Sequence, residues 1–153
     1  MKRILGIKRK SLAHGFAAVV LGSASLISVA SAANDDSMIQ SAGGISYITG
    51  GVGLDSIDRL TSLSSNFNLK LVFALRSGEY LSEVKVAISD MGGRTLLDTT
   101  TDGPWLLTKL PAGNYRIAAT FGGNTEKRNI SVGAGLRTVD FRWASEQRIA
   151  LDR

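Results

Sequence analysis

The sequence contains no cysteine and only one histidine, His14, close to the N-terminus. Without cysteine the protein has neither a disulfide nor a thiol nucleophile. Imidazole is the usual proton shuttle near neutral pH and, together with thiolate, the usual ligand of zinc and copper. We therefore expect no catalytic residue of these kinds, no metal and no cofactor, and a fold that depends on its hydrophobic core alone.

The first 32 residues have the composition of a signal peptide. The basic head "MKRILGIKRK" contains no acid, the apolar run "FAAVVLGSASLISVA" follows, and Ala30-Ser31-Ala32 supplies the small residues of a cleavage site. A spanning helix needs about 20 predominantly apolar residues, and this run is shorter and rich in serine. We predict cleavage after Ala32 or one residue later, loss of His14 with residues 1–32, a periplasmic protein, and no membrane anchor after cleavage.

The net charge of +5 comes from this N-terminal segment. Five of the 18 Lys and Arg residues lie within the first ten positions, so residues 33–153 carry 13 basic and 13 acidic side chains. Binding to nucleic acid requires clustered basic residues on the folded domain. No nucleic-acid partner is therefore expected. A domain without net charge also has little colloidal repulsion to keep it from associating with other proteins.

Alternating apolar side chains from residue 67 onward predict an all-β fold. In "NLKLVFALRS" and "EVKVAIS" every second residue is apolar, as in a strand with one buried face. Five further short strands follow, with Gly or Pro turns about every ten residues: "TLLDTT", "WLLTKL", "YRIAATF", "RNISV" and "LRTVDFRW". This spacing is typical of an antiparallel β-sandwich. We predict a seven-stranded antiparallel sandwich over residues 67–143 and an exposed tail over residues 144–153.

Residues 33–66 are predicted to lead into the sandwich. Residues 33–44 are small and polar and are expected to be flexible, "ISYIT" is a candidate short strand, and the glycine-rich "GGVG" interrupts it. Apolar side chains at steps of three then predict a short helix with one narrow stripe, formed by Leu54, Ile57, Leu60 and Leu63.

The middle of the chain carries a series of motifs in a familiar order. They are "VKVAIS" (from Val84), "DMGG" (from Asp90), "TDG" (from Thr101) and "LPAGNY" (from Leu110). This series resembles the carboxypeptidase-regulatory-like, transthyretin-like modules of exported bacterial proteins, over about residues 67–143. The whole arrangement also looks like small periplasmic proteins of proteobacteria that carry this module after a "GG-x-G" segment and a short helix.

The resemblance implies a prealbumin-like (Ig-like) β-sandwich with a short N-terminal helix. It does not imply peptidase activity, because in carboxypeptidases this module sits beside the catalytic domain and holds no catalytic residue. Nothing in the chain matches the hormone-binding channel of transthyretin specifically. A shared fold does not establish a shared function.

The segment "LPAGNYRI" is predicted to be a structural corner of the sandwich. Pro111 fixes φ for a turn, and Gly113 is expected to supply a positive φ. Tyr115 then enters the edge of the core with its hydroxyl near water or a backbone carbonyl, as in the tyrosine corner of other sandwiches. No ligand is needed to explain these three residues.

The glycines of "GGVG" (Gly50, Gly51 and Gly53) are similar in spacing to a phosphate-binding loop. The dinucleotide fingerprint requires a third glycine where this chain has Ser56, and no P-loop Lys-Ser/Thr follows. We interpret the segment as a flexible joint or a tight start of the helix. It is also the most distinctive candidate for a contact surface.

The remaining candidate site residues are acidic and aromatic. Asp90, Asp98 and Asp102 lack the ladder of a calcium loop and are interpreted as turn acids. A glycosidase pair needs a cleft, and the serine–lysine motif "S-x-x-K" does not occur. Trp105 and Trp143, with Phe141 and Tyr80, are candidates for a sugar-binding platform. Trp105 follows a Gly-Pro pair and is interpreted as either core or a ligand contact. Phe141 and Trp143 share a face with Val139 and are expected in the core.

We therefore predict a non-enzymatic exported module that acts by protein–protein or cell-envelope contacts. The expected contact surfaces are an edge strand and the segment around Gly50, Gly51, Gly53 and Trp105. The alternative is a carrier of a small apolar or carbohydrate ligand. A third hypothesis, hydrolysis of envelope material by carboxylates, predicts turnover that is lost when one specific Asp or Glu is replaced.

Overall fold

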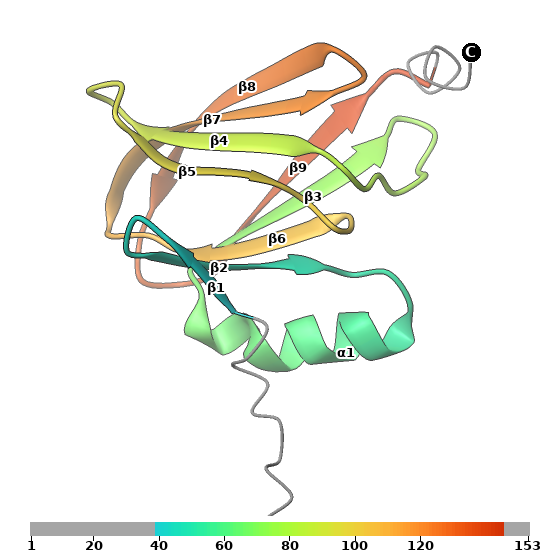
Figure 1. Ribbon diagram of the computed structural model, residues 1–153, viewed down its shortest axis with the longest axis horizontal. Coiled ribbons are helices and arrows are strands. Elements are labelled where there is room, and N and C mark those ends of the chain that lie inside the picture. The colour runs from blue at the N-terminus through green and yellow to red at the C-terminus, as the bar shows by residue number, and fades with distance from the viewer. Residues whose placement is uncertain (1–38, 146–153) are drawn as a thin grey trace, which may run out of the picture. The chain divides into compact units, whose positions relative to one another are not determined.

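The protein is described from a computed structural model over residues 39–145, which form two β-sheets and one helix (Figure 1). The first sheet has five strands in the order β1 (Gln40–Ala42), β2 (Ile45–Gly50), β6 (Trp105–Lys109), β3 (Leu69–Leu75) and β9 (Arg137–Trp143). The second has four, in the order β5 (Thr95–Thr100), β4 (Lys85–Asp90), β7 (Gly113–Phe121) and β8 (Asn124–Val132). The predicted all-β sandwich with a short helix is confirmed.

The described chain has nine strands rather than the seven predicted. All seven predicted strands are present as β3 to β9. The other two, β1 and β2, form a hairpin that turns at Gly43 and Gly44, and β2 pairs with β6. The hairpin therefore belongs to the sheet, although it falls within residues 33–66. Ile45 and Tyr47 of β2 are buried on one face and Ile48 on the other, which explains why this strand is retained.

Every strand pair is antiparallel except β3 and β9, which run parallel in register from Leu69 and Arg137 to Leu75 and Trp143. The prediction of a wholly antiparallel sandwich is therefore wrong at this pair. Alternation of apolar residues specifies which face of a strand is buried, but it does not specify the direction of the neighbouring strand.

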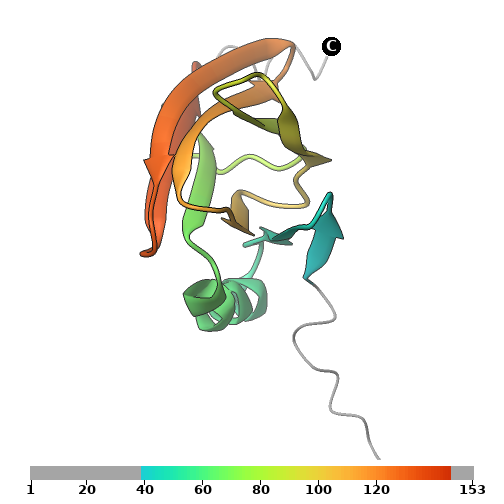
Figure 2. The ribbon, with the colours of Figure 1, turned by 90° about the vertical axis from the view of Figure 1, so that its left-hand side faces the viewer.

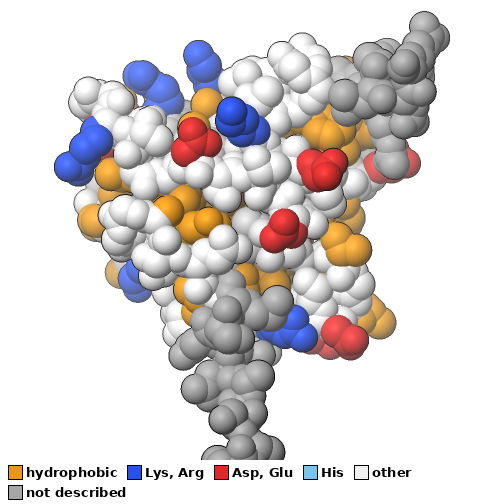
Figure 3. All heavy atoms as spheres, in the orientation of Figure 1, with side chains coloured by type: hydrophobic (Ala, Val, Ile, Leu, Met, Phe, Trp, Pro, Cys, Tyr) orange, Lys and Arg blue, Asp and Glu red, His pale blue; other side chains and the backbone are white. Residues whose placement is uncertain are grey.

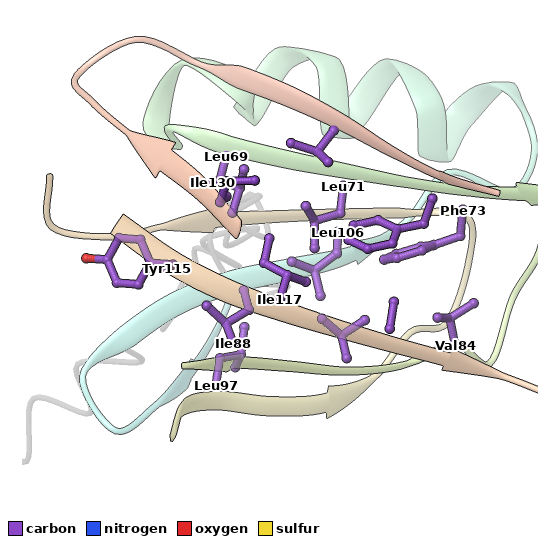
Figure 4. Packing of buried hydrophobic residues seen from close by; sticks show 14 of the residues in the cluster. Leu69, Leu71, Phe73, Val84, Ile88, Leu97, Leu106, Tyr115, Ile117 and Ile130 are labelled. Carbon is purple, nitrogen blue, oxygen red and sulfur yellow. The ribbon is translucent and has the colours of Figure 1, made fainter. Parts of the chain in front are cut away.

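The main core fills the space between the two sheets, and the side chains of both layers point toward one another (Figure 4). Its aromatic part consists of Phe73, Phe141 and Trp143, whose ring centroids are 5.9–6.4 Å apart. Phe121 packs against Trp143 at 6.0 Å. Such tilted aromatic pairs add stabilisation beyond the area that they bury.

Helix α1 (Leu54–Leu63) lies on the face of the five-stranded sheet that is turned away from the four-stranded sheet (Figures 1 and 2). A short 3₁₀ turn, η2 (Ser64–Asn66), connects it to β3. The helix forms a second apolar cluster with the sheet, made of Ile48, Leu60, Leu63, Phe67 and Leu107. Leu54 was expected in the same stripe but is 78% exposed, because the helix packs on the sheet through its second half.

A buried asparagine, Asn68, ties three parts of the sandwich together where β3 begins. Its Nδ2 donates to the carbonyl oxygens of Leu110 (2.7 Å) and Gly133 (2.9 Å), and its Oδ1 accepts from the Leu110 N–H (2.9 Å). The side chain therefore connects the β6–β7 turn with the β8–β9 loop. Within residues 39–145, no helix is long and apolar enough to cross a membrane.

Candidate functional site

A pocket of about 430 Å³ opens beside the glycine-rich segment. Three parts of the chain form its walls: the connection between β2 and α1, the loop that follows β3, and the start of β6. The lining residues are Gly51, Val52, Gly53, Ile57, Tyr80, Ser82, Pro104 and Trp105. The structure thus brings together Gly51, Gly53 and Trp105, three of the four residues expected to form a contact surface.

Trp105 forms one wall of this pocket and is held from two sides. It packs against the apolar cluster under α1 and is only partly exposed. The Lys70 ammonium lies 3.2 Å from the centroid of the indole, in cation–π geometry. Burial lowers the pKa of Lys70, and the nearby carboxylate of Asp140 partly offsets this effect. A fixed indole of this kind presents a rigid apolar surface to a ligand.

The glycine-rich segment packs tightly against Trp105. Gly51 has φ 95°, and a Cβ atom at this position would lie 3.0 Å from Cγ of the indole. Gly103 lies so close to the Gly50 carbonyl that a Cβ atom there would approach its oxygen to 2.3 Å. Of the two interpretations of "GGVG", the structure therefore shows the tight start of a helix, with Gly53 as its N-cap.

The loop does not present a free phosphate cradle. The Gly51 N–H donates to Ser56 Oγ at 2.9 Å, and the Gly53 carbonyl accepts from the Ile57 N–H at 3.1 Å. A phosphate-binding loop needs several backbone N–H groups aimed at the ligand. Ser56, which breaks the dinucleotide fingerprint, is therefore the residue that closes this loop on itself.

Exposed apolar side chains gather at the rim of the pocket. Of the five large hydrophobic side chains exposed among the described residues, Val52 (64% exposed) and Tyr80 (65% exposed) line the pocket, and Leu54 follows Gly53 directly. On the face shown in Figure 3, hydrophobic side chains reach the surface in several places between isolated charged ones. A cluster of apolar side chains around a hollow is the usual surface of a binding site.

The aromatic residues considered as a ligand platform divide into two groups. Tyr80 and Trp105 lie together in the pocket. Phe141 and Trp143 are buried in the main core, as expected from their alternation with Val139, and Trp143 Nε1 donates to the Asn124 carbonyl at 3.0 Å. A platform of all four rings is therefore not formed.

The corner formed by Pro111, Gly113 and Tyr115 lies outside this pocket. The Tyr115 hydroxyl donates a hydrogen bond to the Pro111 carbonyl, and the ring is 95% buried at the edge of the core. Burial, with a further effect of the Asp90 carboxylate, raises the pKa of Tyr115. Gly113 does not have the expected positive φ, because β7 already begins at this residue and pairs with Val132.

Of the three candidate calcium ligands, Asp90 and Asp102 lie at turns as interpreted, whereas Asp98 lies within a strand. Asp90 accepts from the Arg94 N–H and pairs with its guanidinium at 3.3 Å. Asp102 Oδ2 accepts from the Thr49 hydroxyl at 3.0 Å, and Asp98 is exposed on β5. No group of three or more potential metal ligands occurs among residues 39–145.

Sequence reasoning missed Lys70 and Ser82 as residues of the site or its supports, and it placed Ile57 in the helix stripe but not in the pocket. Lys70 and Val72 are the outward-facing residues of a strand, and only the position of α1 shows that part of this face is covered. The signal available in the sequence was a lysine inside the otherwise apolar run "LKLVFAL".

No protein-family model matches the chain, and no curated protein matches it. Among solved structures, the chain is similar to Klebsiella pneumoniae 5-hydroxyisourate hydrolase, which has a transthyretin-like fold, with 21% sequence identity and a TM-score of 0.45. The similarity covers 51% of this chain and 90% of that chain. The carboxypeptidase-regulatory-like assignment remains a prediction from the motifs.

Proposed function

We propose that this protein is a non-enzymatic, transthyretin-like module that is exported to the periplasm and acts by binding another protein of the cell envelope. The observation that carries this proposal is the apolar pocket between "GGVG" and Trp105, with Val52, Leu54 and Tyr80 exposed around it. The carboxypeptidase-regulatory-like motifs and the signal-peptide composition of residues 1–32 support the family and the location.

The pocket has the composition of a protein-binding hot spot. Such sites are rich in tryptophan and tyrosine and accept an apolar side chain of the partner in a pocket that excludes water. A volume of about 430 Å³ holds one large aromatic or aliphatic side chain with its neighbours. The exposed rim residues Val52 and Leu54 would cover such an anchor. We therefore infer that the partner inserts an apolar side chain beside Trp105.

The walls of the pocket are held in place before any partner binds. The close contacts of Gly51 and Gly103 fix the loop, and Lys70 and the helix cluster fix the indole. Because less conformational freedom is lost on association, a rigid site binds more tightly than a mobile one of the same area.

The pocket favours binding over catalysis. The polar side-chain groups among its lining residues are the hydroxyls of Tyr80 and Ser82 and the indole N–H of Trp105. A serine nucleophile needs an adjacent general base, and none of the lining residues supplies one. Hydrolysis of envelope material remains the third hypothesis, and it predicts turnover that depends on a single carboxylate.

A small apolar or carbohydrate ligand is the second candidate, favoured by the pairing of Trp105 and Tyr80 in a pocket of ligand size. Tryptophan fluorescence distinguishes the two. Trp143, the other tryptophan, is buried in the core. A saturable change in emission that disappears in Trp105→Ala would therefore report a small ligand in the pocket.

Site-specific photo-crosslinking in living cells tests the proposal. A benzophenone amino acid replaces Tyr80 in one variant and Met91 in a control, because Met91 is also exposed and apolar but lies at the opposite end of β4. We expect one defined protein adduct from position 80, none from position 91, and loss of the adduct when Trp105→Ala is added. Identical adducts from both positions, or an adduct that survives Trp105→Ala, would refute this use of the pocket.

A further inference from the structure

A second groove, of about 480 Å³, lies on the side of the sandwich where β8 and β9 form the edges of their sheets. β9 pairs with β3 along all seven of its residues. Within the described chain its other edge carries no strand, and β8 is likewise paired only with β7. The groove therefore exposes backbone groups of a free strand edge as well as side chains.

Four arginines line this groove: Arg76, Arg128, Arg137 and Arg142. The acidic lining residues are Glu126 and Asp140. Residues 33–153 carry no net charge, so an excess of positive charge here is a local property of the fold. Concentrating like charges costs electrostatic energy unless an anion neutralises them.

None of the four arginines forms an ion pair within residues 39–145. Arg137 Nη1 donates to the Ser131 carbonyl at 2.8 Å, which uses one of its five donors. The Arg128 guanidinium carbon lies 5.4 Å from the centroid of Phe141, where the ring positions it without neutralising its charge. Among residues 39–145, neither the Arg76 nor the Arg142 guanidinium has a hydrogen-bond or ion-pair partner, and both residues are exposed. The bidentate donors that suit carboxylates are thus largely available.

The charges are distributed along the length of β9. Arg137 is its first residue, and Arg142 is next to its last. The Arg76 N–H donates to the Trp143 carbonyl at 2.8 Å, which places Arg76 at the C-terminal end of the strand. A seven-residue strand is roughly 23 Å long. An extended ligand is therefore required to reach both ends.

We propose that an extended acidic segment of a partner protein adds as a strand to the free edge of β9, with its carboxylates paired to the four arginines. Strand addition satisfies both the N–H and the C=O groups of an open edge, and pockets or charges beside the edge select the side chains. A phosphate group accepts hydrogen bonds but donates few, so it satisfies only half of the edge. The peptide is for this reason the occupant favoured over a phosphorylated or lipid polyanion.

The test uses a fluorescein-labelled peptide of about eight Glu residues, a length that matches β9. As a strand it presents carboxylates on both faces, as required because Arg137 and Arg142 lie on opposite faces of β9. We expect a saturable rise in anisotropy with the purified protein at low ionic strength, weakening as salt is added. The double variant Arg76→Glu/Arg142→Glu should raise the Kd at least about tenfold. The matched control is Lys85→Glu/Arg116→Glu, the same charge reversal on the outer face of the four-stranded sheet. It should shift the Kd less than about twofold.

A second peptide, methylated on alternate backbone nitrogens, separates strand addition from simple anion binding. It keeps every carboxylate but cannot complete a ladder, so its affinity should fall at least about tenfold. Amide exchange of β9 should slow with the unmodified peptide only. The proposal is overturned by absence of saturable binding, by equal binding of the methylated peptide, or by tripolyphosphate displacing the probe as efficiently as unlabelled peptide. Equal loss in the control variant would also overturn it.

Discussion

Replacing Asn68 should destabilise the fold far more than a single polar substitution usually does. Asn68→Ala removes the two hydrogen bonds donated by Nδ2 and the one accepted by Oδ1, and it leaves the buried N–H and carbonyl of Leu110 without these partners. Each lost bond costs about 1 kcal/mol, and an unsatisfied buried group costs about 1–3 kcal/mol. We therefore expect a loss of roughly 3–5 kcal/mol in the free energy of unfolding.

The near-isosteric Asn68→Asp tests the same arrangement through pH. One carboxylate oxygen can still accept from the Leu110 N–H, but the other faces the carbonyl oxygens of Leu110 and Gly133. Burial and this repulsion favour the protonated acid, so the pKa in the folded state should rise above its ordinary value of about 3.9. The protonated side chain therefore contributes fully to the free energy of unfolding below a pH of about 3.9, and this contribution is lost as pH rises through the pKa of the folded state. The difference in free energy of unfolding between Asn68→Asp and the unsubstituted protein should thus grow from acidic to neutral pH.

Urea unfolding followed by tryptophan fluorescence, to which the buried Trp143 contributes, measures both effects, and an unchanged m-value is the check for two-state behaviour. The control is Asn129, an exposed asparagine on β8, whose replacement by Ala or Asp should change stability by less than about 0.5 kcal/mol. A loss below about 1 kcal/mol in Asn68→Ala would refute the reasoning. So would an Asn68→Asp deficit that is the same at acidic and neutral pH.

Three further predictions concern the pocket, the corner and export. Gly51→Ala should cost about 1–2 kcal/mol in backbone strain and should displace Trp105, which would shift the tryptophan emission. The control Gly123→Ala introduces the same backbone strain, but its Cβ atom would contact no other atom, so the emission should not change. Equal emission shifts in the two variants would contradict the packing of Gly51 against Trp105. Tyr115→Phe should cost about 1 kcal/mol. The pKa of Tyr115 is raised in the folded state, so the free energy of unfolding of the parent protein should fall as pH rises above about 10. The Phe variant should lack the contribution of Tyr115 to this fall. Parallel curves of stability against pH for the two proteins would contradict this role of Tyr115. N-terminal sequencing of periplasmic protein should begin directly after Ala32 or one residue later, and an uncleaved cytoplasmic chain would contradict export.

Much of the sandwich was predictable because each buried strand repeats apolar residues with a period of two. The candidate strand "ISYIT" corresponds to β2. Its hairpin partner β1 escaped because β1 is three polar or small residues and the turn lies in a segment that reads as flexible. The exposure of Leu54 escaped for another reason. A period of three gives the stripe of a helix, but it does not reveal which turn of the helix meets the sheet.

The pocket was predictable in part and the arginine groove was not. "GGVG" and Trp105 are unusual in sequence, and pairing of β2 with β6 places Gly50 directly opposite Trp105. The four arginines are separate in sequence and come from the loop after β3, from β8 and from β9. A net charge of zero concealed them, since charge totals carry no information about which side chains the topology brings together. Asn68 was missed because its partners, Leu110 and Gly133, are backbone groups of distant loops.

The pairing of β3 with β9 determines when the protein can fold during biosynthesis. A nascent chain that has not yet emerged from the ribosome as far as Arg137 has an unprotected β3 and lacks Phe141 and Trp143, two of the largest rings of its interior. Closing so long a loop is slow. We therefore expect the native sandwich to form only once this last strand is available, and a chain truncated before Arg137 should not reach it.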